Sequence, residues 1–127
     1  MNEKKLTKIS AVGVCISIIA LYVVTNQIFS VNVNIGEIDK SFIGKSVNIT
    51  GTVVDITKNK GNFFVDLEDD TGKIKLILWE DTAELLQSNG IEINEMDKGN
   101  IINVVGEVQV YKGELEIIPI RGNLNFL

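Results

Sequence analysis

The chain has 127 residues, of which 45% are apolar, and it carries 12 basic and 17 acidic residues, for a formal net charge of −5. It contains one cysteine, one proline and no histidine. This composition excludes a histidine base, a Ser-His-Asp or Cys-His nucleophile, a His/Cys zinc site and an internal disulfide. The acidic balance also argues against a general polyanion binder, since phosphate affinity comes from clustered Lys and Arg. We therefore predict a protein that is not an enzyme and needs no cofactor.

The charge is divided unevenly along the chain. Residues 1–36 contain three lysines and one glutamate, whereas residues 37–127 contain nine basic and sixteen acidic residues. The first part includes a long uncharged, apolar stretch. As a helix rising about 1.5 Å per residue, residues 9–29 would span about 32 Å, enough to cross a hydrocarbon core about 30 Å thick. The sequence thus predicts a single transmembrane helix, a signal anchor, after a basic tail at residues 1–8.

The charges on either side of residues 9–29 indicate an orientation. Lysines precede the stretch and acidic residues follow it, so the positive-inside rule places the N-terminus in the cytoplasm and the following domain outside it. Two other interpretations stay open. The first is a cleaved signal peptide, although such a peptide would have a shorter apolar region followed by an A-x-A pattern, which is missing here. The second is a buried helix of a soluble protein.

Beyond residue 45 the apolar residues alternate with polar ones, which is the pattern of β-strands with one buried face. In the first such segment Val47, Ile49 and Val53 share one side. Turn clusters separate the segments, including Asp69-Asp70-Thr71-Gly72, in which the glycine can adopt a positive φ. The five predicted strands are residues 46–57, 63–69, 73–79, 100–111 and 114–121.

A short helix is predicted between the third and fourth strands, at residues 80–88. Asp81 or Thr82 is positioned to cap its N-terminus. The apolar residues of this helix, which we expect to pack inward, are Ala83, Leu85 and Leu86.

Five strands with a helix between the third and fourth have the order of an oligonucleotide/oligosaccharide-binding (OB) barrel. Gly51 and Gly106 lie within strands and suit the bends that such a barrel needs. The predicted fold class is all-β: a five-stranded OB-fold barrel with one short helix between strands three and four, preceded by a single N-terminal transmembrane helix. The predicted organisation is a basic tail (1–8), a transmembrane helix (9–29), a linker (30–44), an OB-fold domain (45–121) and a C-terminal tail (122–127).

Three segments of the chain carry a family resemblance: VNITGTVVDI, FFVDLEDDTGKIKLILW and GNIINVVGEVQVYKGELEI. Together they resemble the OB-fold nucleic-acid-binding family typified by the anticodon-binding domains of class II aspartyl- and lysyl-tRNA synthetases. The resemblance covers about residues 45–121. Its most specific part is the F-x-x-L-x-D-x-x-G run formed by Phe64, Leu67, Asp69 and Gly72.

The resemblance implies a binding face for single-stranded nucleic acid on the second and third strands. In that family an aromatic residue of strand two stacks on a base and a polar residue of strand three reads base edges; Phe64 and Lys75 take these positions. The rest of that face and the loops beside the usual OB cleft contribute further residues. The predicted contact residues are Phe64, Lys75, Ile77, Trp79, Lys58, Lys60, Lys73, Tyr111 and Lys112.

Some of these residues have a structural interpretation as well. Phe64 can pack against the N-terminal segment or a partner, and Trp79 can pack over the end of the barrel under the helix. Glu68 stands where the synthetase domains often carry an arginine, and with Asp66 it would oppose a phosphate nearby. The paired Asp69 and Asp70 belong to a hairpin that needs no ion, so no metal site is predicted.

Two functions therefore compete. The first, which we favour, is a membrane-anchored OB protein that binds single-stranded nucleic acid. The second is an extracytoplasmic OB module that binds protein, carbohydrate or a small ligand as part of an envelope assembly, with an envelope protein as its partner. An anchor followed by an OB barrel is similar to the haem chaperones of cytochrome c maturation, but the histidine that mostly holds haem there is absent. The acidic face and the N-x-[ST] sequon at Asn48 favour the second function. Separately, the frequent use of Asn, Ile and Lys is typical of an AT-rich prokaryotic genome.

Overall fold

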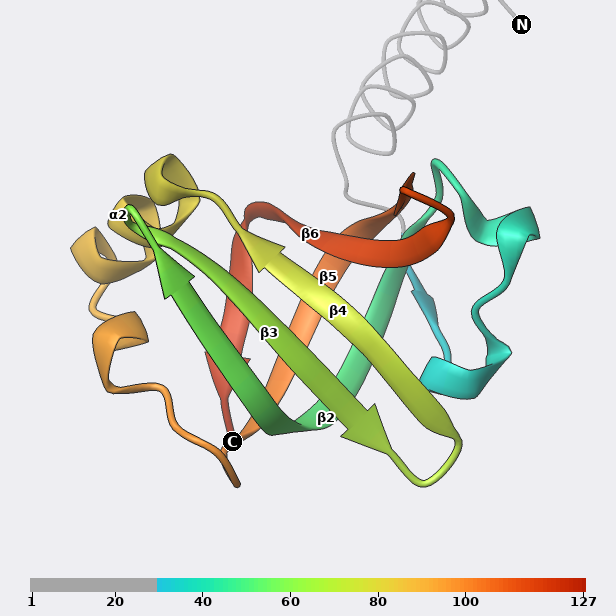
Figure 1. The fold of residues 1–127 in the computed structure, drawn as a ribbon, viewed down its shortest axis with the longest axis horizontal. Coiled ribbons are helices and arrows are strands. Elements are labelled where there is room, and N and C mark those ends of the chain that lie inside the picture. Colours follow the sequence, from blue (N-terminus) through green and yellow to red (C-terminus); the bar gives the residue numbers. More distant parts are fainter. Residues whose placement is uncertain (1–29) are drawn as a thin grey trace, which may run out of the picture.

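The computed structural model describes residues 30–127. The predicted basic tail and transmembrane helix, residues 1–29, lie outside the described residues. In residues 30–127 the structure contains no helix with the length and hydropathy needed to span a bilayer. The body of the domain consists of five long strands (Figure 1). They are β2 (Ser46–Asn59), β3 (Asn62–Asp69), β4 (Gly72–Leu78), β5 (Ile101–Tyr111) and β6 (Glu114–Phe126).

The five long strands close into a barrel. Their order is β2-β3-β4-β6-β5, and β5 pairs again with β2. Every pairing among them is antiparallel except that of β4 with β6, which is parallel. The helix α2 (Glu80–Ser88) lies between β4 and β5 in the chain. The predicted all-β barrel of five strands with one short helix is confirmed.

The alternating pattern determines which side chains fill the barrel. Successive side chains of a strand point to opposite faces, so every second residue enters the core. Val47, Ile49 and Val53 of β2 are at most 1% exposed, as predicted. The other fully buried large side chains from the strands are Leu67, Leu76, Leu78, Ile102, Ile117 and Leu124, with Ile77 a special case described below.

Two of the hairpins use the turn that the strand twist favours. Lys60 and Gly61 between β2 and β3 have φ of 53° and 83°, and Lys112 and Gly113 between β5 and β6 have φ of 51° and 79°. Positive φ at both central residues is typical of the type I′ turn, whose twist matches that of the flanking strands. The turns are therefore tight and hold the neighbouring strands in register.

The turn between β3 and β4 is built differently. Gly72 has no positive φ, so the expectation for that glycine is wrong. The carboxylate of Asp69 instead closes the turn by accepting hydrogen bonds from the N–H groups of Thr71, at 2.7 Å, and Gly72, at 3.0 Å. An aspartate side chain that bonds to the backbone two residues later replaces the conformation that a glycine would supply.

Residues 30–44, expected to be a linker, contain three short elements. The first is β1 (Val31–Asn32), which pairs in parallel with the start of β2. The 3-10 turns η1 (Ile35–Glu37) and η2 (Lys40–Phe42) follow it.

This segment is packed on the barrel. Ile35 and Ile38 are 3% and 9% exposed and belong to the core. The N–H of Ile35 donates to Asp69 Oδ2 at 2.8 Å, and the N–H of Gly36 donates to Thr71 Oγ1 at 2.8 Å. The β3–β4 turn thus holds η1, and the folded domain begins well before residue 45.

Helix α2 starts without a side-chain cap of its own. Its N-cap residue is Trp79, and the N–H of Glu80 donates to Asn62 Oδ1 of β3 at 2.8 Å. The predicted caps at Asp81 or Thr82 are wrong because the helix begins directly after β4, where a residue of β3 supplies the acceptor. Of the three apolar helix residues, Ala83 and Leu86 are buried, whereas Leu85 is 43% exposed because it lies off the face that the other two share.

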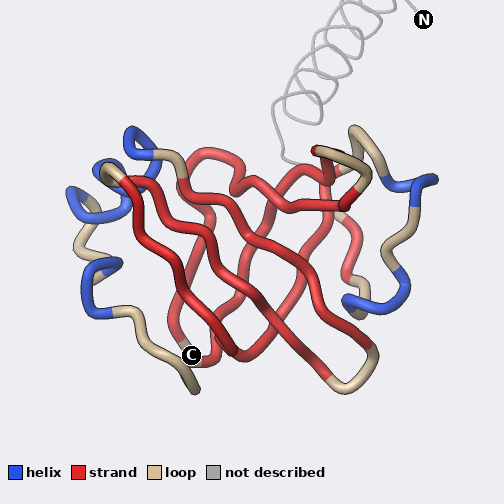
Figure 2. Tube along the Cα trace, in the orientation of Figure 1, coloured by secondary structure: helices blue, strands red, loops and turns tan. Residues whose placement is uncertain are grey.

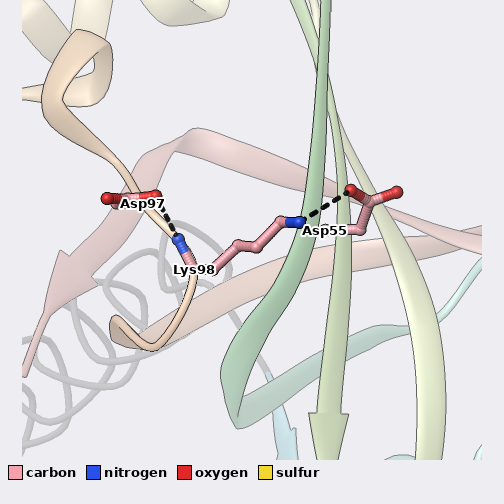
Figure 3. A network of polar contacts seen from close by, with 3 residues as sticks. All are labelled: Asp55, Asp97 and Lys98. Atoms are coloured by element: carbon pink, nitrogen blue, oxygen red, sulfur yellow. Dashed lines mark hydrogen bonds and ion pairs between the residues drawn. The ribbon is translucent and has the colours of Figure 1, made fainter.

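The segment between α2 and β5 covers one end of the barrel. It contains η3 (Ile93–Glu95), with Ile93 fully buried. An ion pair links the end of this segment to β2: the Nζ of Lys98 lies 4.0 Å from Asp55 Oδ1 (Figure 3). Such an exposed pair contributes at most about 1 kcal/mol. The backbone N–H of Lys98 also donates to Asp97 Oδ1 at 2.8 Å, within the segment itself. Figure 2 shows α2 and η3 on one side of the strands and η1 and η2 on the opposite side.

Strand β6 extends beyond the predicted end at Arg121. It continues to Phe126, which pairs with Ile102, so residues 122–126 are part of the barrel rather than a tail. The pairing of β5 with β6 shifts register at Gly106. A Cβ there would lie 2.7 Å from the backbone oxygen of Ile118, so only glycine allows the two strands to approach this closely.

Candidate nucleic-acid interface

A groove of about 580 Å³ lies on the outer face of the barrel, where β3, β4, β5 and β6 contribute side chains. We call it the β4–β6 groove. Its volume lies within the range of about 300–1,000 Å³ that is usual for ligand sites. The residues that line it are Phe64, Lys75, Ile77, Trp79, Gln109, Val110, Tyr111, Lys112, Glu114, Glu116 and Ile118.

The structure brings six of the nine predicted contact residues together in this groove. They come from β3, from β4 and the residue after it, and from the end of β5 and its turn to β6; they are Phe64, Lys75, Ile77, Trp79, Tyr111 and Lys112. Strand register explains why the first three lie together. Phe64 pairs with Ile77 across the β3–β4 hairpin, and Lys75 lies two residues before Ile77 on β4 and therefore on the same face.

Strand register arranges the groove in two rows. The apolar row consists of Phe64 on β3, Ile77 on β4 and Ile118 on β6. The polar row runs beside it, through residues that pair from strand to strand: Lys75 with Glu116, and Glu116 with Gln109. Asp66, the β3 partner of Lys75, lines the neighbouring hollow beside η1. A flat, apolar ligand on the first row would therefore present its edge to the second.

Aromatic side chains stand over the apolar row. The rings of Phe64 and Trp79 are 6.2 Å apart between centroids and meet edge to face, at 87°. Ile77 below them is only 2% exposed, although it points away from the barrel core. Trp79 is 46% exposed, and Tyr111 is 59% exposed with Lys112 Nζ 5.3 Å from its ring centroid. Trp79 thus lines the groove and remains accessible rather than lying buried under the helix.

Glu116 is a groove residue that the sequence reasoning missed. Its side chain is partly buried, and this burial raises its pKa above the ordinary value, an effect that Lys75 opposes and Glu114 reinforces. Lys75 and Glu116 are register partners, yet within the described chain no ion pair at 4.0 Å or less joins them. The carboxylate therefore faces the groove without a closed salt bridge.

The alternation of β6 contained a signal for this residue. Leu115 and Ile117 enter the barrel, so Glu114, Glu116 and Ile118 must lie on the outer face. What no local pattern indicates is that β6 runs parallel to β4 and brings these side chains next to Lys75.

Three of the predicted lysines lie outside the groove. Lys58 Nζ donates to the carbonyl of Asn94 at 3.3 Å and stands 5.3 Å from the ring centroid of Phe63, near α2. Lys73 lines a different hollow beside η1, and Lys60 lies in the β2–β3 turn.

The lysines therefore do not converge on one patch. In the groove itself Lys75 and Lys112 are balanced by Glu114 and Glu116. A ligand bound here gains little from net charge, so stacking and hydrogen bonds must supply the affinity.

A second hollow, polar and of about 430 Å³, lies beside β1 and β2. Four asparagines contribute to it, among them Asn48 of the sequon and Asn103. Asn103 Nδ2 donates to Asn48 Oδ1 at 2.6 Å, so the amide oxygen of Asn48 is engaged within the fold. Over residues 30–127 no group of three or more His, Cys, Asp or Glu side chains is arranged to hold a metal ion.

An OB barrel with an aromatic groove on its outer face defines a class of binding domain, and the sequence places the chain in a family of that class. A family model for the OB-fold nucleic acid binding domain of the tRNA anticodon type matches residues 47–120. Because this is more than half of the chain, the protein belongs to that family. No match was found among the curated proteins.

Solved structures with the same fold include two OB-fold assemblies. The S. pombe Stn1–Ten1 complex matches at 19% identity with a TM-score of 0.54. A replication protein A heterotrimer bound to single-stranded DNA matches at 20% identity with a TM-score of 0.51. In both cases the match covers 65% of this chain and 57% of the other. At these identities the likeness shows the fold.

Proposed function

We propose that the protein binds single-stranded nucleic acid in the β4–β6 groove. The observation that carries this proposal is the accessible aromatic pair of Phe64 and Trp79 over an apolar row, on the outer face of an OB barrel. Stacking of a base on such a platform contributes about 1–3 kcal/mol and needs no particular sequence. Membership of a nucleic-acid-binding family supports the same ligand, and replication protein A, which has this fold, is bound to single-stranded DNA in the matching structure.

The charge of the groove indicates how the ligand is held. Lys75 and Lys112 are the basic residues that line it, and two glutamates oppose them. Single strands release counterions with a slope of about −0.7 in log K against log salt for each phosphate contacted. Two phosphate contacts would give a slope of about −1.4, so binding depends mainly on bases.

We further propose that residues 9–29 anchor the domain in a membrane, with residues 30–127 on the extracytoplasmic side. The lysines before the apolar stretch and the acidic residues after it support this orientation. A reporter that is active only in the cytoplasm, fused after Leu127, is expected to be silent. An active reporter would overturn the orientation, and recovery of the chain in the soluble fraction would overturn the anchor.

The test of binding uses the fluorescence of Trp79, the single tryptophan of the chain. The full chain in detergent micelles is titrated with a dT oligonucleotide at low salt. We expect saturable quenching, and we expect Phe64→Ala to weaken the affinity about tenfold or more because a stacking surface is lost. Phe64→Leu keeps an apolar side chain but no planar ring, and should fall between the two.

The matched control is Phe42→Ala, which removes the same side chain from η2, away from the groove. It should leave the affinity unchanged, and circular dichroism of each variant confirms that it is folded. Absence of quenching at low salt, where electrostatic attraction is strongest, would contradict the proposal.

The lack of net positive charge in the groove favours one alternative, an extracytoplasmic OB module that binds an envelope protein, a carbohydrate or a small ligand. The same titration separates the two functions. Quenching of Trp79 by soluble cell-wall glycans, with no response to oligonucleotides, would favour the alternative.

A further inference from the structure

We propose that one end of the barrel docks on the surface of the membrane that holds the anchor. This inference rests on the proposed anchor at residues 9–29 and goes beyond it, because it names the surface of the domain that lies against the lipid headgroups. Three observations carry it: the short reach of the chain after residue 29, the apolar side chains exposed at this end, and the difference in charge between the two ends of the barrel.

The chain has almost no length between the proposed anchor and the barrel. Val31 is the first residue of β1 and pairs with Val47 of β2. At about 3.3 Å per residue, the chain from residue 29 to residue 31 reaches about 7 Å, which is close to the thickness of one headgroup layer, about 5–7 Å. The barrel therefore cannot stand away from the bilayer, and the end at which β1 starts must lie at the headgroups.

Strand pairing shows which parts of the barrel share this end. β1 is parallel to β2, so both strands start there. The N–H of Gly44 donates to the carbonyl of Val108 at 2.8 Å, and the N–H of Val108 donates to the carbonyl of Lys45 at 3.0 Å, so β5 ends beside the start of β2. The start of β1, residues 39–45 and residues 110–114 form this end, which we call the anchor-side rim. Figure 1 shows α2 at the other end of the barrel.

The anchor-side rim exposes apolar side chains that nothing else in residues 30–127 covers. Val31, Ile43, Val110 and Tyr111 are between 42% and 59% exposed. Half of the large apolar side chains that the described chain exposes are therefore gathered at this end. A lipid surface suits them, because a tyrosine ring can be buried at the headgroup level while its hydroxyl stays hydrated, and branched apolar side chains leave water there.

The two ends of the barrel differ in charge. The anchor-side rim has three lysines and two carboxylates, which belong to Lys40, Lys45, Lys112, Asp39 and Glu114. The opposite end, residues 80–98 with α2 and η3, has six acidic residues and one basic residue. An anionic membrane surface attracts lysines and repels carboxylates within a Debye length. Such a surface therefore favours contact with the anchor-side rim and turns the α2 end towards solvent.

This orientation has a consequence for the β4–β6 groove. Tyr111 and Lys112 belong to the anchor-side rim and also line the groove. One end of the groove therefore opens beside the lipid headgroups. Because both residues belong to the proposed nucleic-acid site, the test of docking leaves them unchanged.

The experiment places a fluorescent label on the full chain in vesicles. Cys15, the single cysteine, is removed by Cys15→Ser, and the label is attached through Ile43→Cys. The matched control is Leu85→Cys on α2, a position with almost the same exposure. The vesicles contain phosphatidylcholine and phosphatidylglycerol in equal parts, and a fraction of the phosphatidylcholine headgroups carries a nitroxide quencher. Because Leu85 lies against Gly122 of β6, the control label is on the order of 20 Å further from the membrane, at about 3.3 Å per residue of strand.

We expect the nitroxide to remove most of the fluorescence at position 43 and almost none at position 85. Lys45→Glu should weaken the quenching at position 43 because it reverses a charge of the anchor-side rim. Lys60→Glu, the same change in the β2–β3 turn, should leave the quenching as it is. Circular dichroism of each variant confirms that it is folded.

The other outcomes separate docking from the proposed function. Equal quenching at the two positions, or none at either, in chains that float with the vesicles would overturn lipid as the occupant and leave the anchor and nucleic-acid binding intact. An envelope protein would then be the partner that covers the anchor-side rim. Unchanged quenching in Lys45→Glu would overturn the role of charge. A chain that does not float with the vesicles would overturn the proposed anchor, and the docking with it.

Discussion

Asp69 and Glu116 are both partly buried carboxylates of the same barrel, but their neighbours differ. Burial raises the pKa of Asp69, yet the hydrogen bonds that it accepts from Thr71, Ile35 and Gly72 outweigh this effect and hold its pKa below the ordinary value. From the residues that the structure describes Glu116 receives no such bond, and burial leaves its pKa raised. A carboxylate whose acceptors are used by the backbone maintains the fold, whereas one whose acceptors are free is available to a ligand.

The largest expected effect separates these two roles by stability. Asp69→Ala removes the acceptor that closes the β3–β4 turn and holds η1, and should lower the free energy of unfolding by about 1–2 kcal/mol, after allowance for partial exposure. Thermal unfolding followed by circular dichroism measures the change. Asp70→Ala, at the exposed neighbouring position, should have almost no effect. If both variants were equally stable, η1 would not depend on Asp69.

Acidification tests the sign of the contribution that Asp69 makes to the free energy of unfolding. Because the folded-state pKa of Asp69 is depressed, its stabilisation is present above the ordinary pKa of about 3.8 and is lost as the pH falls through the folded value. The wild-type chain should therefore lose more stability below pH 3.8 than Asp69→Asn does. Parallel acid melts of the two proteins would test this, and identical profiles would contradict it.

A smaller effect concerns salt. With two lysines in the groove, the affinity for a dT strand should fall by about sevenfold at most between 50 and 200 mM salt, as the slope of about −1.4 requires. Fluorescence titrations at four salt concentrations give the slope. A much steeper slope would mean that Lys58, Lys60 and Lys73, which lie outside the groove, also contact phosphates.

The smallest expected effect is on the stability of Glu116→Gln. A raised folded-state pKa means that ionisation disfavours the folded state, so stability falls as the pH rises from the ordinary value of 4.5 through the raised folded-state pKa. At neutral pH the variant should be as stable as the wild type or slightly more stable, by a few tenths of a kcal/mol. Thermal unfolding at pH 7 checks this. A clear loss of stability would place Glu116 with Asp69, among residues that maintain the fold.

Much of the fold could be predicted from the sequence because the relevant signals are local. Alternating β-branched residues place the five strands within a few residues, since side chains of a strand alternate between two faces. The type I′ turns at Lys60-Gly61 and Lys112-Gly113 likewise depend on neighbouring residues. The place of Phe64 on the outer face and its pairing with Ile77 follow from the short β3–β4 hairpin.

The tertiary structure alone decided the remaining features. Lys75 meets Glu116 because β4 and β6 pair in parallel across a closed barrel, and no short-range pattern encodes that pairing. Lys58 turns towards Asn94 because η3 covers that end of the barrel. Ile35 enters the core because Asp69 holds its N–H. The sequence by itself thus determined the strands, their faces and the aromatic platform, whereas long-range packing decided which charged side chains share the groove.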